Sequence, residues 1–217
     1  MTNIPSYTYF GGKHEETAVL TNVLRAQGIC SPNNKQPLSE AMVLGIGGGL
    51  GAGYILYIFK EPPAKVIYFG WQNQWQFTIP FYENFCKRIN VTPTFHETGS
   101  RQVAARQLQQ TLDNGQPVVA WVDRAQMPYL QQPELIEGHI PHFITIYGIE
   151  SDQILVDDLA AKPFRVPSET MASARDRIPS FKNRLLSISA NGEFDLQGAI
   201  HSGLQYCVDY LSQSSAT

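Results

Sequence analysis

The sequence predicts an α+β fold in which N-terminal helices pack on a mostly antiparallel sheet. Apolar residues recur at helical spacing in the first part of the chain, and short β-prone segments separated by turn residues dominate the later part. Helices and strands that are largely segregated along a chain are typical of α+β proteins, whereas α/β folds alternate them.

The first helix is predicted over residues 17–27, because apolar residues recur there at helical spacing and Gly28 supplies a typical stop. A glycine-rich run at 45–53 allows the backbone to turn freely and to approach another group closely. The same apolar periodicity predicts further helices over residues 39–44, 78–90, 102–113, 168–177 and 195–211.

The strands are predicted from short β-prone segments. Residues 54–59 and 65–69 are separated by Pro62 and Pro63, which indicates a turn between two strands. Three further strands are predicted over residues 117–122, 142–149 and 153–156, and the last two form a hairpin after an irregular insertion at 126–140.

Length and composition predict one large domain over residues 1–190, followed by a helical segment over 191–217. The chain has 217 residues, of which 43% are hydrophobic and 16% charged, so it can form a substantial core. Its net charge is −3 and it has no basic cluster, which argues against nucleic acid as a partner.

The three cysteines, Cys30, Cys86 and Cys207, form neither a disulfide framework nor a metal-ligand spacing. We therefore expect no metal and no cofactor, and we expect a reducing cytoplasm. The N-terminus does not read as a signal peptide. Residues 41–59 are uncharged, but their glycines favour a buried segment over a membrane span.

His142 and Asp158 are the strongest candidates for chemistry. His142 begins one strand of the predicted hairpin and Asp158 ends the other, so the two side chains can face each other. An aspartate that binds one imidazole nitrogen fixes the tautomer and leaves the other nitrogen as a base. Asp157 is the alternative partner, because neighbouring residues on a strand point to opposite faces.

Glu15 and His14 lie at the start of the first predicted helix. A carboxylate in the first turn of a helix is favourable on its own, because the helix N-terminus carries partial positive charge. Glu15 could instead act as a general base or bind a substrate ammonium group. His14 could cap the helix or belong to a site.

Three more segments are candidates for lining a pocket. The run that contains Gly48 and Gly49 matches a nucleotide fingerprint only loosely, and a glycine loop beside a pocket is the better interpretation. The aromatic and amide residues around Trp71 could line a cleft or fill the core. Asp123 could be a pocket acid or a helix N-cap.

Several of these motifs, in this order, resemble the N-terminal domain of butirosin biosynthesis protein H. The resemblance covers roughly residues 9–186 and rests on residues 12–18, 38–40, 45–51, 115–118, 122–123, 128–129, 142–143, 147–148 and 165–177. It implies a papain-like (C39 peptidase-like) fold and an activity that transfers an aminoacyl chain from an acyl carrier protein to an amine.

The resemblance also implies roles for individual residues. The family has a cysteine nucleophile directly after the histidine of its first motif, and this chain has Glu15 there. His142 matches the family histidine and Asp158 its acid. With Gly48, Gly49, Trp71 and Asp123, Tyr129 is expected to contact substrate. The expected partners are a small-molecule amine acceptor and an acyl carrier protein, with a homodimer as one oligomeric state. The alternatives are an inactive papain-like binding domain and an amide hydrolase.

Overall fold

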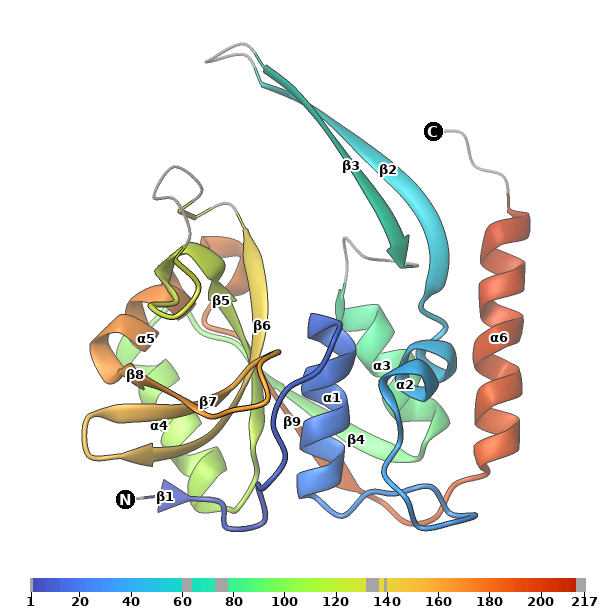
Figure 1. Cartoon of the computed structure of the whole chain (residues 1–217), viewed down its shortest axis with the longest axis horizontal. Coiled ribbons are helices and arrows are strands. Elements are labelled where there is room, and N and C mark those ends of the chain that lie inside the picture. Colours follow the sequence, from blue (N-terminus) through green and yellow to red (C-terminus); the bar gives the residue numbers. More distant parts are fainter. Residues whose placement is uncertain (1, 60–63, 73–77, 132–136, 139, 214–217) are drawn as a thin grey trace. The chain divides into compact units, whose positions relative to one another are not determined.

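The computed structural model of the protein describes residues 2–59, 64–72, 78–131, 137–138 and 140–213 (Figure 1). Within it the chain forms two compact units. Unit 1 comprises residues 1–40 and 92–191, and unit 2 comprises residues 41–91 and 192–217. The domain boundary predicted after residue 190 stays a prediction.

Unit 1 contains a β-sheet with the strand order β4-β9-β5-β6-β7-β8, and β1 pairs with β6 outside this order. The pairs β5–β6, β5–β9, β6–β7, β7–β8 and β1–β6 are antiparallel. The strands are β1 (Thr2–Asn3), β4 (Val91–His96), β5 (Val118–Asp123), β6 (Pro141–Glu150), β7 (Gln153–Asp157), β8 (Phe164–Pro167) and β9 (Leu185–Ala190).

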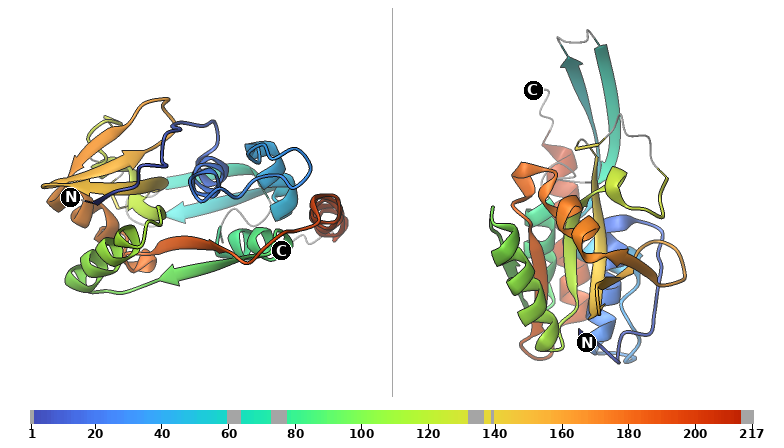
Figure 2. Two further views of the ribbon diagram at one scale, coloured as in Figure 1. Left: turned by 90° about the horizontal axis from the view of Figure 1, so that it is seen from below. Right: turned by 90° about the vertical axis from the view of Figure 1, so that its left-hand side faces the viewer.

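Three helices flank this sheet: α1 (Glu15–Ala26), α4 (Arg101–Asp113) and α5 (Ser168–Asp176). In the right-hand view of Figure 2, α1 and α4 lie on opposite sides of the strands, and both contact β5 and β6. α1 ends before Gly28, whose φ of 70° few other residues adopt easily. A hydrophobic core cluster joins α4 and α5 to β5, β6 and β7.

Unit 2 contains α2 (Glu40–Gly47), α3 (Thr78–Arg88), α6 (Leu196–Ser212) and a two-stranded hairpin of β2 (Leu50–Phe59) and β3 (Ala64–Gln72). The glycines allow close packing here. A Cβ on Gly203 of α6 would lie 2.1 Å from the carbonyl oxygen of Gly45, so α2 and α6 approach through glycine. Phe81 of α3 packs against Gly47 in the same way.

The predicted α+β class is confirmed, and every predicted helix is present with bounds shifted by a few residues. Strands β4, β8 and β9 were not predicted. The predicted insertion at 126–140 lies partly outside the described residues, and the 3₁₀ helix η1 (Arg124–Gln126) precedes most of it. Of the helices that the structure describes, none has the length and apolarity that a membrane crossing requires.

Candidate active site

Glu15, His142 and Asp158 meet in unit 1. His142 is the second residue of β6 and is fully buried, Glu15 is the first residue of α1, and Asp158 follows β7. His142 Nε2 lies 2.7 Å from Asp158 Oδ2, in a buried hydrogen bond. On the other side of the ring, Nδ1 lies 2.8 Å from Glu15 Oε2 and forms an ion pair with it. One imidazole therefore bridges two carboxylates.

The two adjacent aspartates have different partners, as the alternation of side chains on a strand requires. Asp158 binds His142. Asp157 accepts hydrogen bonds from the Tyr7 hydroxyl, from the Gly11 backbone N–H at 2.8 Å and from Asn22 Nδ2 at 2.7 Å. Burial raises the pKa of Asp157 to about 6, against the lowering effect of these three donors. Asp157 thus ties the segment before α1, and α1 itself, to the end of β7.

Arg124 completes the site and was not predicted from the sequence. Its guanidinium is ion-paired with Glu15 Oε1. It is placed there by Asp123, whose buried side chain caps η1 through the Ala125 N–H and accepts a second hydrogen bond from the Gly138 N–H at 2.7 Å. The pairing of Val122 with His142 across β5 and β6 brings this turn beside the histidine, and that register is the signal that could have identified Arg124.

The electrostatics of the site keep His142 charged at neutral pH. Burial lowers the pKa of His142, but the hydrogen bond to Asp158 and the negative charge of Glu15 outweigh it and raise this pKa to about 9. Burial acts in the opposite sense on the two acids. It is outweighed by His142, which lowers the pKa of both Glu15 and Asp158, with help from Arg124 at Glu15. The negative charges of Glu15 and Asp158 are therefore balanced by the positive charges of His142 and Arg124.

The start of α1 is held by a separate set of contacts. Glu40 accepts hydrogen bonds from the backbone N–H groups of Lys13 and His14 and from the Thr17 hydroxyl. The His14 ring turns toward Thr17 and Glu16, with Nε2 3.1 Å from Glu16 Oε2. Burial raises the pKa of Glu16 to about 8 and lowers the pKa of His14. His14 therefore contacts Glu16 and Thr17, whereas Glu15 contacts His142.

The residues expected to contact substrate are divided between the two units. Tyr129 stacks on Phe164 with ring centroids 3.9 Å apart, and burial and the nearby Asp158 charge raise its pKa. In unit 2, Gly48 and Gly49 pack against Tyr206, Leu44 and Phe81. Trp71 lies in β3, and its side chain is outside the described part of the structure. Substrate contact stays a prediction for all of these residues, and for Asp123.

The three cysteines are not among the residues that the structure brings together at Glu15, His142 and Asp158. All three are free thiols. Cys30 follows α1 in an isolated bridge with Pro37. Cys86 and Cys207 are buried in unit 2, and burial raises the pKa of Cys86 to about 12, which keeps this thiol protonated. Among the described residues, no group of three His, Cys, Asp or Glu side chains has the arrangement of a metal site.

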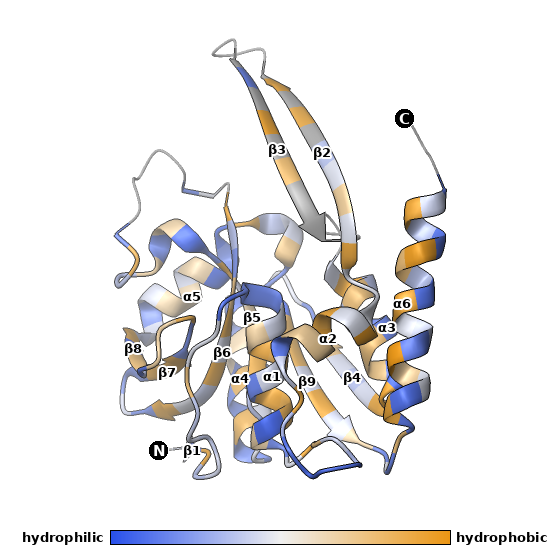
Figure 3. Ribbon diagram, turned by 45° about the vertical axis from the view of Figure 1, so that its right-hand side comes forward, coloured by the Kyte–Doolittle hydropathy of each residue, from blue (hydrophilic) through white to orange (hydrophobic). Residues whose placement is uncertain are grey.

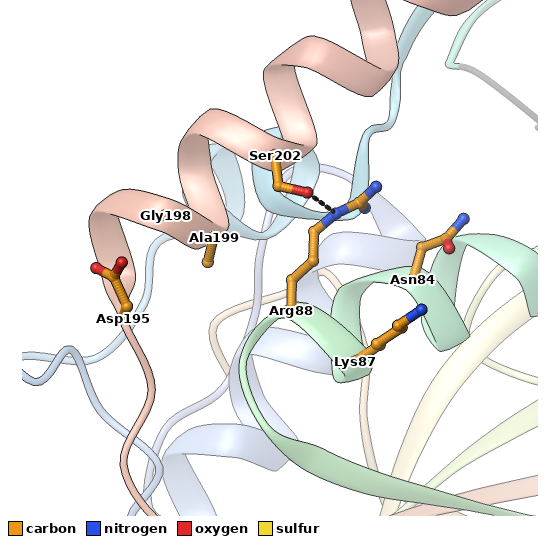
Figure 4. Close-up of a pocket in the computed structure, with 7 residues that line it drawn as sticks. All are labelled: Asn84, Lys87, Arg88, Asp195, Gly198, Ala199 and Ser202. Carbon is orange, nitrogen blue, oxygen red and sulfur yellow. Dashed lines mark hydrogen bonds between the residues drawn. The ribbon is translucent and has the colours of Figure 1, made fainter.

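Unit 2 contains a separate cavity between α3 and α6, with a volume of 390 Å³ (Figure 4). Arg88 crosses it, donating to the Ser202 hydroxyl at 3.2 Å and to the carbonyl of Ile46 at 2.9 Å. Its lining includes Lys87 and Asp195, of opposite charge, but none of the residues predicted to be catalytic.

Comparison with known families assigns the chain to one of them. The sequence profile of the N-terminal domain of butirosin biosynthesis protein H matches residues 14–159, which is more than half of the chain and spans Glu15, Arg124, His142 and Asp158. The chain belongs to the butirosin biosynthesis protein H N-terminal family. No curated protein matched the sequence.

The structure of this butirosin-H-type domain is similar to the crystal structure of a protein described as a C39-like peptidase from Bacillus anthracis. The TM-score is 0.54 at 13% sequence identity, and the match covers 89% of this chain and all of the other. At this identity the similarity concerns the fold alone. The papain-like α+β fold implied by the sequence resemblance is thereby confirmed.

Proposed function

We propose that this butirosin-H-type domain binds an acyl thioester or amide of specialised metabolism without forming a covalent acyl-enzyme. The observation that carries the proposal is the carboxylate of Glu15, ion-paired with His142 and Arg124 where the family resemblance expects a cysteine. A thiolate in this position is a good acyl carrier, whereas a carboxylate is a poor one in amide chemistry.

The charges of the site favour binding without turnover. A general base must be unprotonated and free to accept a proton near the working pH. His142, with a pKa of about 9, is an imidazolium at neutral pH. Glu15 is unprotonated, but its pKa is held below the usual range by its two cationic neighbours, so it is a weak base. The pair has the charge pattern of a thiolate and an imidazolium without the thiol's reactivity.

Direct acyl transfer is a second candidate, because 23% of the Glu15 side chain remains exposed next to the imidazolium. In this reaction the amine nitrogen of an acceptor attacks the carbonyl of a carrier-bound thioester. The C–N bond forms, the C–S bond breaks, the amine proton passes to Glu15, and His142 protonates the departing thiolate. The partners are then a small-molecule amine and an acyl carrier protein. For both candidates we propose a cytoplasmic location, which is supported by the free thiols, because a reducing compartment keeps thiols free.

The test restores the missing thiol. In a Cys30→Ser background, Glu15→Cys places a thiol at a helix N-terminus beside His142, which lowers its pKa. We expect iodoacetamide at pH 6.5 to modify this cysteine at least 10-fold faster than the matched control Glu16→Cys, one residue along the same turn and next to His14. Adding His142→Ala should remove the advantage. Equal rates at residues 15 and 16 would show that His142 and residue 15 do not form a functional pair.

The acyl step is followed with an acyl N-acetylcysteamine thioester and a simple amine. We expect mass spectrometry to find an acyl adduct on residue 15 of Glu15→Cys and none on the wild-type protein. Wild-type turnover that is lost in Glu15→Ala and His142→Ala would select direct transfer over binding. A wild-type acyl adduct on any residue would contradict both candidates.

A further inference from the structure

The β2–β3 hairpin of unit 2 presents one apolar face to solvent. The register pairs Tyr54 with Phe69 and Leu56 with Ile67, and side chains two residues apart on a strand share a face. The exposed fractions are 68% for Tyr54, 50% for Leu56, 63% for Ile58, 50% for Ile67 and 69% for Phe69. These five residues are hereafter the hairpin face. They form a continuous apolar surface on a two-stranded sheet.

The hairpin lacks the features that keep exposed strands apart. Soluble proteins protect edge strands with charged side chains, proline or a covering element, and an isolated two-stranded hairpin is marginally stable in water. The described strand residues are 50–59 and 64–72, and the segment between them, which contains Pro62 and Pro63, lies outside these ranges. The ten residues of β2 include no charged residue, and the nine of β3 include one, Lys65. Lys65 pairs with Ile58, at the end of the hairpin away from Tyr54. A long strand pair with a single charged residue gains stability when a partner covers it.

A second apolar surface occurs on α6 of the same unit. Leu204, Val208 and Leu211 are spaced by four and three residues, so they lie on one side of the helix, and they are 43%, 56% and 55% exposed. Hydrophobic bands run along both the hairpin and α6 in Figure 3. The hairpin face exposes on the order of 500 Å² of apolar area, at the upper end of what monomeric proteins expose. With α6 the total is about 800 Å², the area that each partner buries in a standard-size protein interface.

We propose that a second copy of this chain covers the hairpin face, so that the protein is a homodimer with two-fold symmetry. A two-fold axis brings the same patch of each copy together, which places apolar residues against apolar residues. Lys65 lies at one end of the hairpin face, so the two Lys65 residues of a dimer do not have to lie against each other at the centre of the interface. An anionic lipid surface is the poorer match, because membrane-surface segments carry several lysine or arginine residues and the two strands carry one.

The test measures the oligomeric state of the full chain by sedimentation velocity and light scattering from about 1 to 100 µM, at and above the weak end of the micromolar-to-picomolar range of standard-size interfaces. We expect a wild-type dimer. Tyr54→Thr/Phe69→Thr, which removes one cross-strand pair and retains β-propensity, should raise the dimer dissociation constant at least 10-fold. Tyr9→Thr is the matched control, since Tyr9 is 53% exposed in unit 1, and it should leave the dimer unchanged.

Circular dichroism and thermal unfolding check that each variant is folded, and Ile67→Lys tests the same face with a charge. A wild-type monomer at 100 µM, or a dimer that neither hairpin variant weakens, would overturn the proposal. Flotation with vesicles of phosphatidylcholine and phosphatidylglycerol tests the lipid alternative. A monomer that floats with the vesicles, and no longer does so after Phe69→Thr, would assign the face to a membrane surface instead.

Discussion

Raising the pH should destabilise the protein through His142. Its pKa is about 9 in the folded chain, against 6.5 for an unperturbed histidine. Because the folded state binds this proton more tightly, the stabilisation is fully present below pH 6.5 and is lost as the pH rises through 9. At about 1.4 kcal/mol for each pH unit, this difference corresponds to about 3 kcal/mol of unfolding free energy.

The magnitude depends on the groups that face the imidazole. Asp158 and Glu15 contribute the negative charge, Arg124 lies beyond Glu15, and the phenol of Tyr129 lies beside Asp158. Glu16 must be separated from this effect. Its pKa is raised to about 8, so its ionisation also destabilises the folded state as the pH rises from about 4.5 to 8. Both groups lower stability in the same direction over overlapping ranges.

The assay therefore compares Glu16→Gln with Glu16→Gln/His142→Gln, by urea unfolding followed through tryptophan fluorescence between pH 6 and 10. The difference in unfolding free energy between the two proteins should shrink by about 3 kcal/mol between pH 6.5 and 9.5. Titration of ¹³C-labelled histidine by NMR gives the pKa of His142 directly. A pKa of 7 or below, with a constant free-energy difference, would refute the bridged imidazolium and the argument that His142 is not a free base.

Two further predictions concern the contacts around the site. Arg124→Gln should lower the unfolding free energy by about 1–2 kcal/mol, which lies between the values for exposed and buried ion pairs. A double-mutant cycle with Glu15→Gln should show coupling between the two residues. Additive effects would show that the ion pair contributes nothing to stability. Tyr7→Phe removes a buried donor to Asp157 and should cost about 1–3 kcal/mol, whereas Tyr147→Phe, in the ring that stacks on Tyr7, should cost less. Equal losses in chemical denaturation would contradict a specific role for the Tyr7 hydroxyl.

The local sequence pattern was sufficient to predict the helices and strands in which apolar residues recur with a strong period. The helix that begins at Glu15 and ends before Gly28, and the β6–β7 hairpin, follow from apolar spacing and turn residues. Strands β4 and β9 did not follow from local pattern, because they pair with strands that are distant in the sequence. β8 pairs with the neighbouring β7, but it is too short to show a periodic pattern. β4 contains Pro93, β8 has four residues, and β9 lies between β4 and β5 in the sheet although it is more than sixty residues away from either along the chain.

The sequence identified only those site residues whose side chains suggest a chemical role by themselves, namely the histidine and the carboxylates. His142, Glu15 and Asp158 were identified as candidates, and the structure brings them together. Arg124 was missed because its role depends on the register of β5 against β6, which no local pattern encodes. Choosing between Asp157 and Asp158 required the same information, since both acids follow one strand and only the three-dimensional contacts distinguish them.

The backbone at the start of α1 is held by contacts that lie outside the ion pairs of Glu15. Glu40 holds the backbone before the helix, and Asp157 anchors the preceding segment and Asn22, without using the side chain of Glu15. The scaffold that would orient a nucleophile is therefore built independently of whether a nucleophile is present. A change of the side chain at residue 15 can therefore alter the charge and reactivity of the site while the backbone that presents it stays in place.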